Sequence, residues 1–171
     1  MSDVNLVLMD SAVYLGTYRN VTLIDVGGVC DLVHMKAIGS AYRALLDLYP
    51  RGIVALSYLR PGTPVSPADA RAESARFVRE LGDSILFSAM VVEGEGVLPQ
   101  MLRTVIRGVN VLARMPRINV YSRGDEAIRQ VVQYMVPGGD DVEPVAELTS
   151  VVRRVRTAFR PSRRVTLTSR P

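Results

Sequence analysis

From residue 21 onward, short apolar runs alternate with longer segments that have helical periodicity. This alternation predicts parallel strands joined by crossovers, which are right-handed in nearly all proteins. Two closely spaced runs precede it and predict antiparallel pairing. The six runs are residues 5–9, 12–18, 21–26, 53–58, 85–92 and 117–121. The sequence therefore predicts an α/β fold with a mixed sheet, followed by a C-terminal amphipathic helix.

The stretch 53–81 shows the strand–loop–helix unit most clearly. The apolar run 53–58 predicts a strand, and residues 60–64 contain two prolines and a glycine, which favour a surface loop. Ser66 is expected to cap the helix that follows, with Pro67 at its first position and Asp69 in its first turn. Helical spacing predicts an inward face made of Ala68, Ala72, Ala75, Val78 and Leu81.

Three further helices are expected in the body of the chain. Asp31 can cap the first, which ends at Pro50, and a wide apolar arc predicts that the second, residues 98–115, is the most buried helix. Asp125 and Glu126 open the third. The inward positions predicted for the first and third are Ile38, Ala41, Leu45, Leu48, Ile128, Val131, Val132 and Met135.

The net charge of +4 is divided unevenly along the 171 residues. Residues 1–147 carry a net −3, whereas residues 148–171 carry seven arginines and no acid. A mildly acidic body argues against a nucleic-acid surface spread over the domain. One cysteine excludes an internal disulfide framework, and the absence of a secretory signal or a membrane-spanning apolar run predicts a cytoplasmic protein.

The C-terminal part divides into three segments after a domain that covers residues 1–136. Residues 137–143 have the composition of a linker, residues 144–160 predict a basic amphipathic helix, and residues 161–171 predict a disordered basic tail. The contact residues expected on this helix are Val145, Leu148, Val152, Arg153, Arg154, Val155 and Phe159. Its apolar stripe can pack on the chain's own domain, on a protein partner or on a second copy, and its arginines can contact an anionic membrane or nucleic acid.

Catalytic and cofactor motifs are scarce. Cys30 and His34 are four residues apart at a predicted helix start, a spacing that permits a nucleophilic pair or half of a metal site. A buried structural cysteine is the alternative that we favour, because no other histidine or cysteine completes a zinc site. Residues 94–96 lack the lysine of a phosphate-binding loop. We therefore expect no enzyme activity, no metal and no cofactor.

The order of elements over residues 4–136 resembles the STAS-like domains of anti-sigma-factor antagonists and sulfate transporters. The run Arg117-Ile118-Asn119-Val120-Tyr121-Ser122-Arg123-Gly124-Asp125-Glu126-Ala127 resembles their usual ending, a short strand that leads into the last helix. Residues 91–96, with the apolar helix after them, resemble an uncharacterised STAS-like family of myxobacteria. The resemblance implies a non-catalytic regulatory or scaffolding module that acts through protein–protein contact.

In antagonist domains, phosphorylation of a serine at the start of the helix after the central strand controls partner binding. The resemblance places this phosphosite at Ser66 or, less well positioned, at Thr63. The antagonist pattern has an aspartate–serine pair before glycine, whereas this chain has Val65-Ser66-Pro67, and helix capping is the alternative role of Ser66. The predicted docking residues are Arg60, Pro61, Ser66, Asp69 and Arg71.

A second function class uses the wide apolar helix. A crevice beside residues 98–115 would suit a small molecule or a lipid. The protein-contact interpretation predicts that the partner is another protein or a second copy of this chain. The two function classes can be distinguished because only the second predicts an apolar ligand retained by the purified protein.

Overall fold

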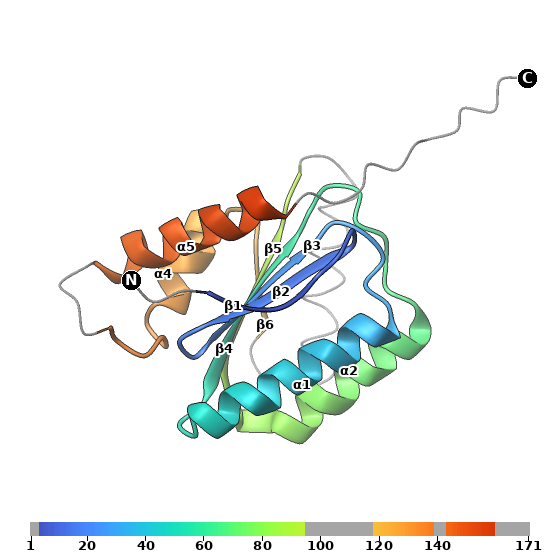
Figure 1. Cartoon of the computed structure of the whole chain (residues 1–171), viewed down its shortest axis with the longest axis horizontal. Coiled ribbons are helices and arrows are strands. Elements are labelled where there is room, and N and C mark those ends of the chain that lie inside the picture. Colours follow the sequence, from blue (N-terminus) through green and yellow to red (C-terminus); the bar gives the residue numbers. More distant parts are fainter. Residues whose placement is uncertain (1–3, 95–117, 139–142, 160–171) are drawn as a thin grey trace, which may run out of the picture.

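The structure, a computed structural model, describes residues 4–94, 118–138 and 143–159, and these residues build one six-stranded sheet with helices on both faces (Figure 1). The strands lie in sequence order across the sheet: β1 (Asn5–Met9), β2 (Val13–Tyr18), β3 (Val21–Val26), β4 (Ile53–Leu59), β5 (Ile85–Val92) and β6 (Ile118–Tyr121). The helices are α1 (Leu32–Leu48), α2 (Ala68–Leu81), α4 (Gly124–Val131) and α5 (Pro144–Ala158), with a 3-10 turn η1 (Gly82–Ser84).

The sheet is mixed, as the sequence predicted. β1 pairs with β2, and β2 with β3, in antiparallel fashion, whereas β3, β4, β5 and β6 are parallel. All six residues of β3 are buried, which is typical of a central strand covered on both faces. The carboxyl ends of the parallel strands therefore meet at one edge of the sheet, and the loops that leave this edge position the candidate site.

Two hydrophobic cores lie on opposite faces of the sheet. Figure 1 shows α1 and α2 together on one face and α4 and α5 on the other. Alternate residues of β4 serve the two cores: Val54 and Leu56 pack on the side of α4 and α5, whereas Ile53 and Ala55 pack on the side of α1 and α2. The strand period of two thus divides the apolar residues between the two layers.

The start of α1 agrees with its predicted cap. The Asp31 carboxylate accepts hydrogen bonds from the backbone N–H groups of Val33 and His34, at 2.9 and 3.1 Å. The His34 ring nitrogen Nδ1 accepts in return from the Asp31 backbone N–H at 3.2 Å, which completes a capping box. The predicted inward position of Leu48 is wrong, because that side chain is 74% exposed in the last turn.

The start and the inward face of α2 differ from the predictions. Pro67, and not Ser66, is the N-cap, and no side chain caps this helix. The predicted inward face is wrong at Ala68 and Ala72, which are exposed, whereas Val78 and Leu81 pack against the core as predicted. The buried residues of α2 are Ala70 and Phe77. The Phe77 ring meets the Tyr42 ring edge-on at 5.5 Å, and burial of so large a ring sets the helix rotation in place of the alanine stripe.

Helix α5 packs on the body of the chain. Its buried side chains Leu148, Val151, Val152 and Val155, with Phe159 after them, belong to the same core as β2, β3, β4 and α4. The Glu143 carboxylate caps α5 by accepting from the backbone N–H groups of Val145 and Ala146. Among the interpretations of the apolar stripe, the structure therefore shows packing on the chain's own sheet. The predicted helix 98–115 and residues 161–171 lie outside the described residues.

Candidate functional site

The loops that follow β3 and β4 are joined at the carboxyl edge of the sheet. The Arg60 backbone N–H donates to the Val26 carbonyl at 2.9 Å. The Thr63 hydroxyl oxygen lies 2.9 Å from the Val26 carbonyl and 2.7 Å from the Arg60 carbonyl, so its one hydrogen can serve either acceptor. Thr63 therefore stabilises the conformation of the two loops. Phosphorylation of its hydroxyl would remove these hydrogen bonds.

Ser66 lies at the amino end of α2 without a capping role. Its side chain is half-buried, and its hydroxyl makes no hydrogen bond with the residues that the structure describes. Arg71, one turn into α2, lines the same cavity as Ser66 and is exposed. The N-cap residue of α2 supplies no side-chain acceptor and, among the described residues, the Asp69 carboxylate accepts only from the Ala70 N–H, at 2.8 Å. The N–H groups of Ala68 and Asp69 therefore keep their positive partial charge.

Arg60 points inward, toward the core side of α5. Its Nε and Nη2 atoms donate to the two carboxylate oxygens of Asp25 at 2.8 and 2.6 Å, and Asp25 is buried. The guanidinium also lies over the Phe159 ring, 4.8 Å from its centroid. Arg60 was predicted as a docking residue together with Ser66, but a long-range ion pair turns its side chain toward Asp25.

A second arginine joins the same network from α5. Arg156 donates to both carboxylate oxygens of Glu93, at 2.6 and 2.7 Å, and its Nε lies 3.5 Å from the Asp25 carboxylate. Its guanidinium stacks over the Tyr58 ring at 4.6 Å. Two carboxylates thus neutralise Arg60 and Arg156, and the network fastens α5 to the carboxyl edge.

Apolar side chains are exposed on the joined loops. Val65 in the β4–α2 loop is 68% exposed, Val33 in the first turn of α1 is 71% exposed, and Val29 just before α1 is 39% exposed. Pro61, Asp69 and Arg71, which precede and follow Val65 in the chain, are also exposed. We call the three valines the valine surface. Val29 and Val33 were not among the predicted site residues, because single valines near a helix cap carry no sequence signal of exposure.

Cys30 and His34 do not form a reactive pair. Cys30 is buried, and burial raises the pKa of its thiol to about 12, with the Asp31 and Asp10 carboxylates adding to the effect. The His34 ring is held at both nitrogens: Nε2 lies 2.7 Å from the Asp10 carboxylate, and Nδ1 accepts from the Asp31 backbone N–H in the capping box. Within the described ranges, no group of three metal-ligating side chains converges. The contacts among Asp10, Asp31 and His34 therefore serve to stabilise the start of α1.

An apolar cavity of ≈ 330 Å³ lies between the sheet and the helices α1 and α2. Ile24, Ile38, Phe77 and Met90 contribute apolar walls, and Ser66 lies at its rim. Residues 95–117, which join β5 to β6, lie outside the described residues. The crevice predicted beside residues 98–115 therefore also lies outside the described residues.

Comparisons with known proteins identify the fold. No protein-family model and no curated protein matches the chain, and none of the described helices has both the length and the apolarity required to cross a bilayer. An uncharacterized protein of the DUF3478 family from Shewanella loihica PV-4, which has a SpoIIAA-like fold, is similar in structure. The match has a TM-score of 0.50 at 12% sequence identity and covers 77% of this chain and 97% of that chain. At this identity the likeness concerns the fold alone, and the fold is STAS-like, as the sequence predicted.

Proposed function

We propose that this chain is a non-catalytic regulatory or scaffolding module that binds a protein partner through the valine surface. The observation that carries the proposal is the exposure of three valines: Val29 and Val65 on two loops that hydrogen bonds hold together, and Val33 in the first turn of α1. Neighbouring exposed apolar side chains within a polar rim are typical of protein contact surfaces.

The partner expected here is a protein that presents apolar side chains to these valines. Arg71 is free to meet an acidic group at the edge of the contact, because it forms no ion pair within the described residues. Arg60 supports the surface from below through Asp25 and does not itself face the partner. Of the predicted docking residues, Pro61, Asp69 and Arg71 are those exposed at the rim.

Two aspartate substitutions and one matched control test this surface. Val33→Asp and Val65→Asp place a charge in the proposed contact, whereas Leu48→Asp places it at the opposite end of α1, where Leu48 is also exposed. We expect the wild-type chain and Leu48→Asp to retain the same partner from host lysate in equal amounts. Each valine variant should retain about tenfold less of that partner. Unfolding midpoints confirm that all variants are folded.

Equal retention of the partner by all four proteins would overturn the valine surface as the contact. Retention of no protein by the wild-type chain would overturn the function itself. A second copy of the chain as the retained species would define the partner as a homo-oligomer, and light scattering would then show a dimer that Val65→Asp dissociates.

The finer proposal is that phosphorylation of Ser66 controls this contact. Its hydroxyl is free of hydrogen bonds within the described residues, and the uncapped end of α2 and Arg71 supply positive charge nearby. Intact mass of the chain from its host should show a phosphate that Ser66→Ala abolishes and Thr63→Ala does not. If the mass shows no phosphate in any growth state of the host, Ser66 phosphorylation does not regulate the contact.

Binding of an apolar small molecule or a lipid is the second candidate, and the cavity between the sheet and α1 and α2 favours it. Its ≈ 330 Å³ falls at the lower end of small-molecule sites. Native mass spectrometry of freshly purified chain should then show a retained ligand that Phe77→Trp, by filling the cavity, displaces. A spectrum of the bare chain alone would exclude this candidate.

A further inference from the structure

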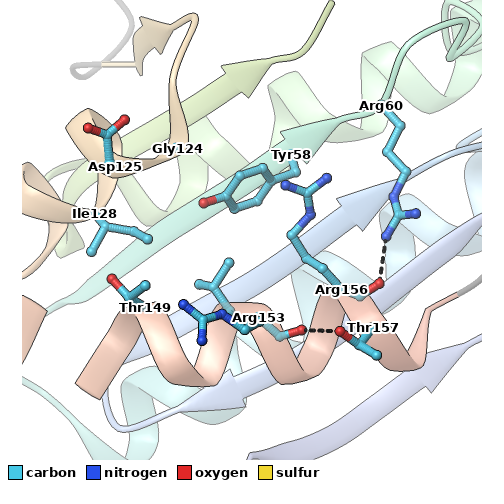
Figure 2. A pocket seen from close by; sticks show the side chains of 10 residues that line it. Tyr58, Arg60, Gly124, Asp125, Ile128, Thr149, Arg153, Arg156 and Thr157 are labelled. Carbon is cyan, nitrogen blue, oxygen red and sulfur yellow. Dashed lines mark hydrogen bonds between the residues drawn. The ribbon is translucent and has the colours of Figure 1, made fainter. Parts of the chain in front are cut away.

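A groove of ≈ 400 Å³ opens between α4 and α5, on the face of the sheet opposite α1 and α2 (Figure 2). Tyr58 of β4 forms its floor, the amino end of α4 forms one wall, and polar residues of α5 form the other. Neither the STAS-like fold nor the valine surface assigns a role to this groove.

Tyr58 supplies a hydroxyl that has no partner among the described residues. The side chain is only 4% exposed, yet its hydroxyl makes no hydrogen bond with the residues that the structure describes. Figure 2 shows the hydroxyl pointing toward Gly124 and Ile128, into the groove. Burial of the side chain is the main cause that raises the pKa of Tyr58 to about 12. The hydroxyl therefore keeps its proton and can donate a hydrogen bond at neutral pH. The core encloses the rest of this side chain, so its hydroxyl is presented as a donor to the groove.

The amino end of α4 lies against this hydroxyl. A Cβ atom at Gly124 would come within 2.9 Å of the Tyr58 hydroxyl oxygen, so only glycine permits this approach. Arg123 is the N-cap of α4 and no side chain caps the helix. The first backbone N–H groups of α4 therefore lack a side-chain acceptor, next to the free hydroxyl.

Helix α5 adds a positive charge and another hydroxyl. Arg153 is exposed and forms no ion pair within the described residues, and Figure 2 shows its guanidinium beside Thr149. The other two arginines of the groove, Arg60 and Arg156, are already neutralised by Asp25 and Glu93.

One carboxylate, that of Asp125, also lines the groove. Arg123 and Arg129 hold it at 3.1 and 3.0 Å, and in Figure 2 it points away from Thr149. These two arginines offset its charge. The donors that remain available face the groove from three sides: the Tyr58 hydroxyl, the amino end of α4, and the Arg153 and Thr149 side chains of α5.

We propose that this groove binds the phosphate group of a small molecule. Helix amino ends, guanidinium groups and hydroxyls are the donors that proteins use for phosphate, and three directions of approach suit a tetrahedral anion better than a planar carboxylate. The ligand is either free phosphate or a phosphate ester, and the groove volume admits an ester with a small organic part. The groove lies between α4 and α5, on the face of the sheet opposite α1 and α2, so its ligand binding is independent of the proposed contact at the valine surface.

Amide NMR of the full-length chain tests this proposal with inorganic phosphate and glycerol 3-phosphate as separate probes, at constant ionic strength set with chloride. We expect the Gly124 and Thr149 amide signals to shift with saturation. Saturation by inorganic phosphate alone would identify free phosphate as the ligand, and tighter binding of glycerol 3-phosphate would identify an ester. Absence of saturating shifts with both probes would overturn the proposal.

Matched variants separate a built site from general attraction to arginines. Arg153→Gln should weaken phosphate binding about tenfold, whereas Arg154→Gln, which removes a neighbouring exposed charge outside the groove, should change it less than about twofold. Tyr58→Phe keeps the buried ring and should weaken binding about tenfold by removing one donor. Equal effects of the two arginine variants would show a nonspecific charge effect and would contradict the site.

Discussion

Helices α2 and α5 differ in how they are attached to the sheet, although both are amphipathic and have 14 and 15 residues. α2 buries two side chains, Ala70 and Phe77, and its amino end has no cap. α5 buries four of its own side chains and is capped by Glu143. The sequence suggested the reverse, with α2 in the central unit of the fold and α5 beyond a linker.

The ends of α5 explain the difference. Near its amino end, Glu147 accepts hydrogen bonds from Tyr18 and Arg19 of the β2–β3 hairpin. Near its carboxyl end, Arg156 pairs with Glu93 at the opposite edge of the sheet. α2 has surface ion pairs of the kind that contribute little, such as Arg76 with Glu73. The less firmly attached helix therefore adjoins the proposed contact surface, and the more firmly attached helix completes the core.

Removal of α5 should have the largest effect. A chain that ends at Val136 loses Leu148, Val151 and Phe159, which are almost fully buried. It should lose cooperative thermal unfolding, because one side of the sheet would expose its core. A sharp unfolding transition in the shortened chain, monitored by circular dichroism, would show that α5 is an accessory to the fold.

Asp25→Asn should cost about 3–5 kcal/mol of the free energy of unfolding, since it leaves the partly buried Arg60 guanidinium without its carboxylate. It also removes one of the two carboxylates beside Arg156, which keeps its pair with Glu93. Urea unfolding measures the loss. Glu80→Gln is the control, because Glu80 pairs with Arg43 on the exposed surface of α1 and α2 and its loss should be far smaller. Comparable losses would mean that the network does not fasten α5.

The rotation of α2 gives an intermediate effect. Ala70→Leu should destabilise the chain by about 1–3 kcal/mol, because Ala70 is fully buried and the extra atoms overfill the core. Ala72→Leu should stay within about 0.5 kcal/mol of the wild type, because Ala72 is exposed. The opposite ranking in urea unfolding would restore the alanine face that helical spacing predicted.

The smallest effect concerns acid stability at the start of α1. Burial raises the pKa of Asp10, but hydrogen bonds from the Val13 and Ala12 backbone and from His34 outweigh it and hold the pKa below its ordinary value of 3.8. A lowered pKa in the folded state stabilises the chain above pH 3.8, and this stabilisation disappears as the pH falls through the lowered value.

Asp10→Asn should therefore lower the urea midpoint at pH 6 and leave it close to that of the wild type at pH 2. Asp69→Asn is a suitable control, because Asp69 is exposed and lies outside this corner. An equal loss at both pH values would show that Asp10 acts through its shape and not through its charge.

Local signals predicted the strands, the Asp31 cap and the mixed sheet, because the pattern of apolar residues and the capping chemistry are written in neighbouring positions. Tertiary contacts decided the rest. Phe77 sets the rotation of α2, and Arg60 points to Asp25, which lies 35 residues away in the sequence. The stripe on α5 would look the same for any apolar partner, so its docking on the chain's own sheet required the structure.

The direct test of the account is a comparison of the full chain with a chain that ends at Arg160, which keeps α5 and omits residues 161–171. Both proteins are used to capture partners from host lysate, and both are unfolded thermally. The account predicts the same unfolding midpoint and the same protein partner, because the valine surface and the core are complete in both. Loss of the partner with an unchanged midpoint would place the contact in the arginine-rich tail and would contradict the account.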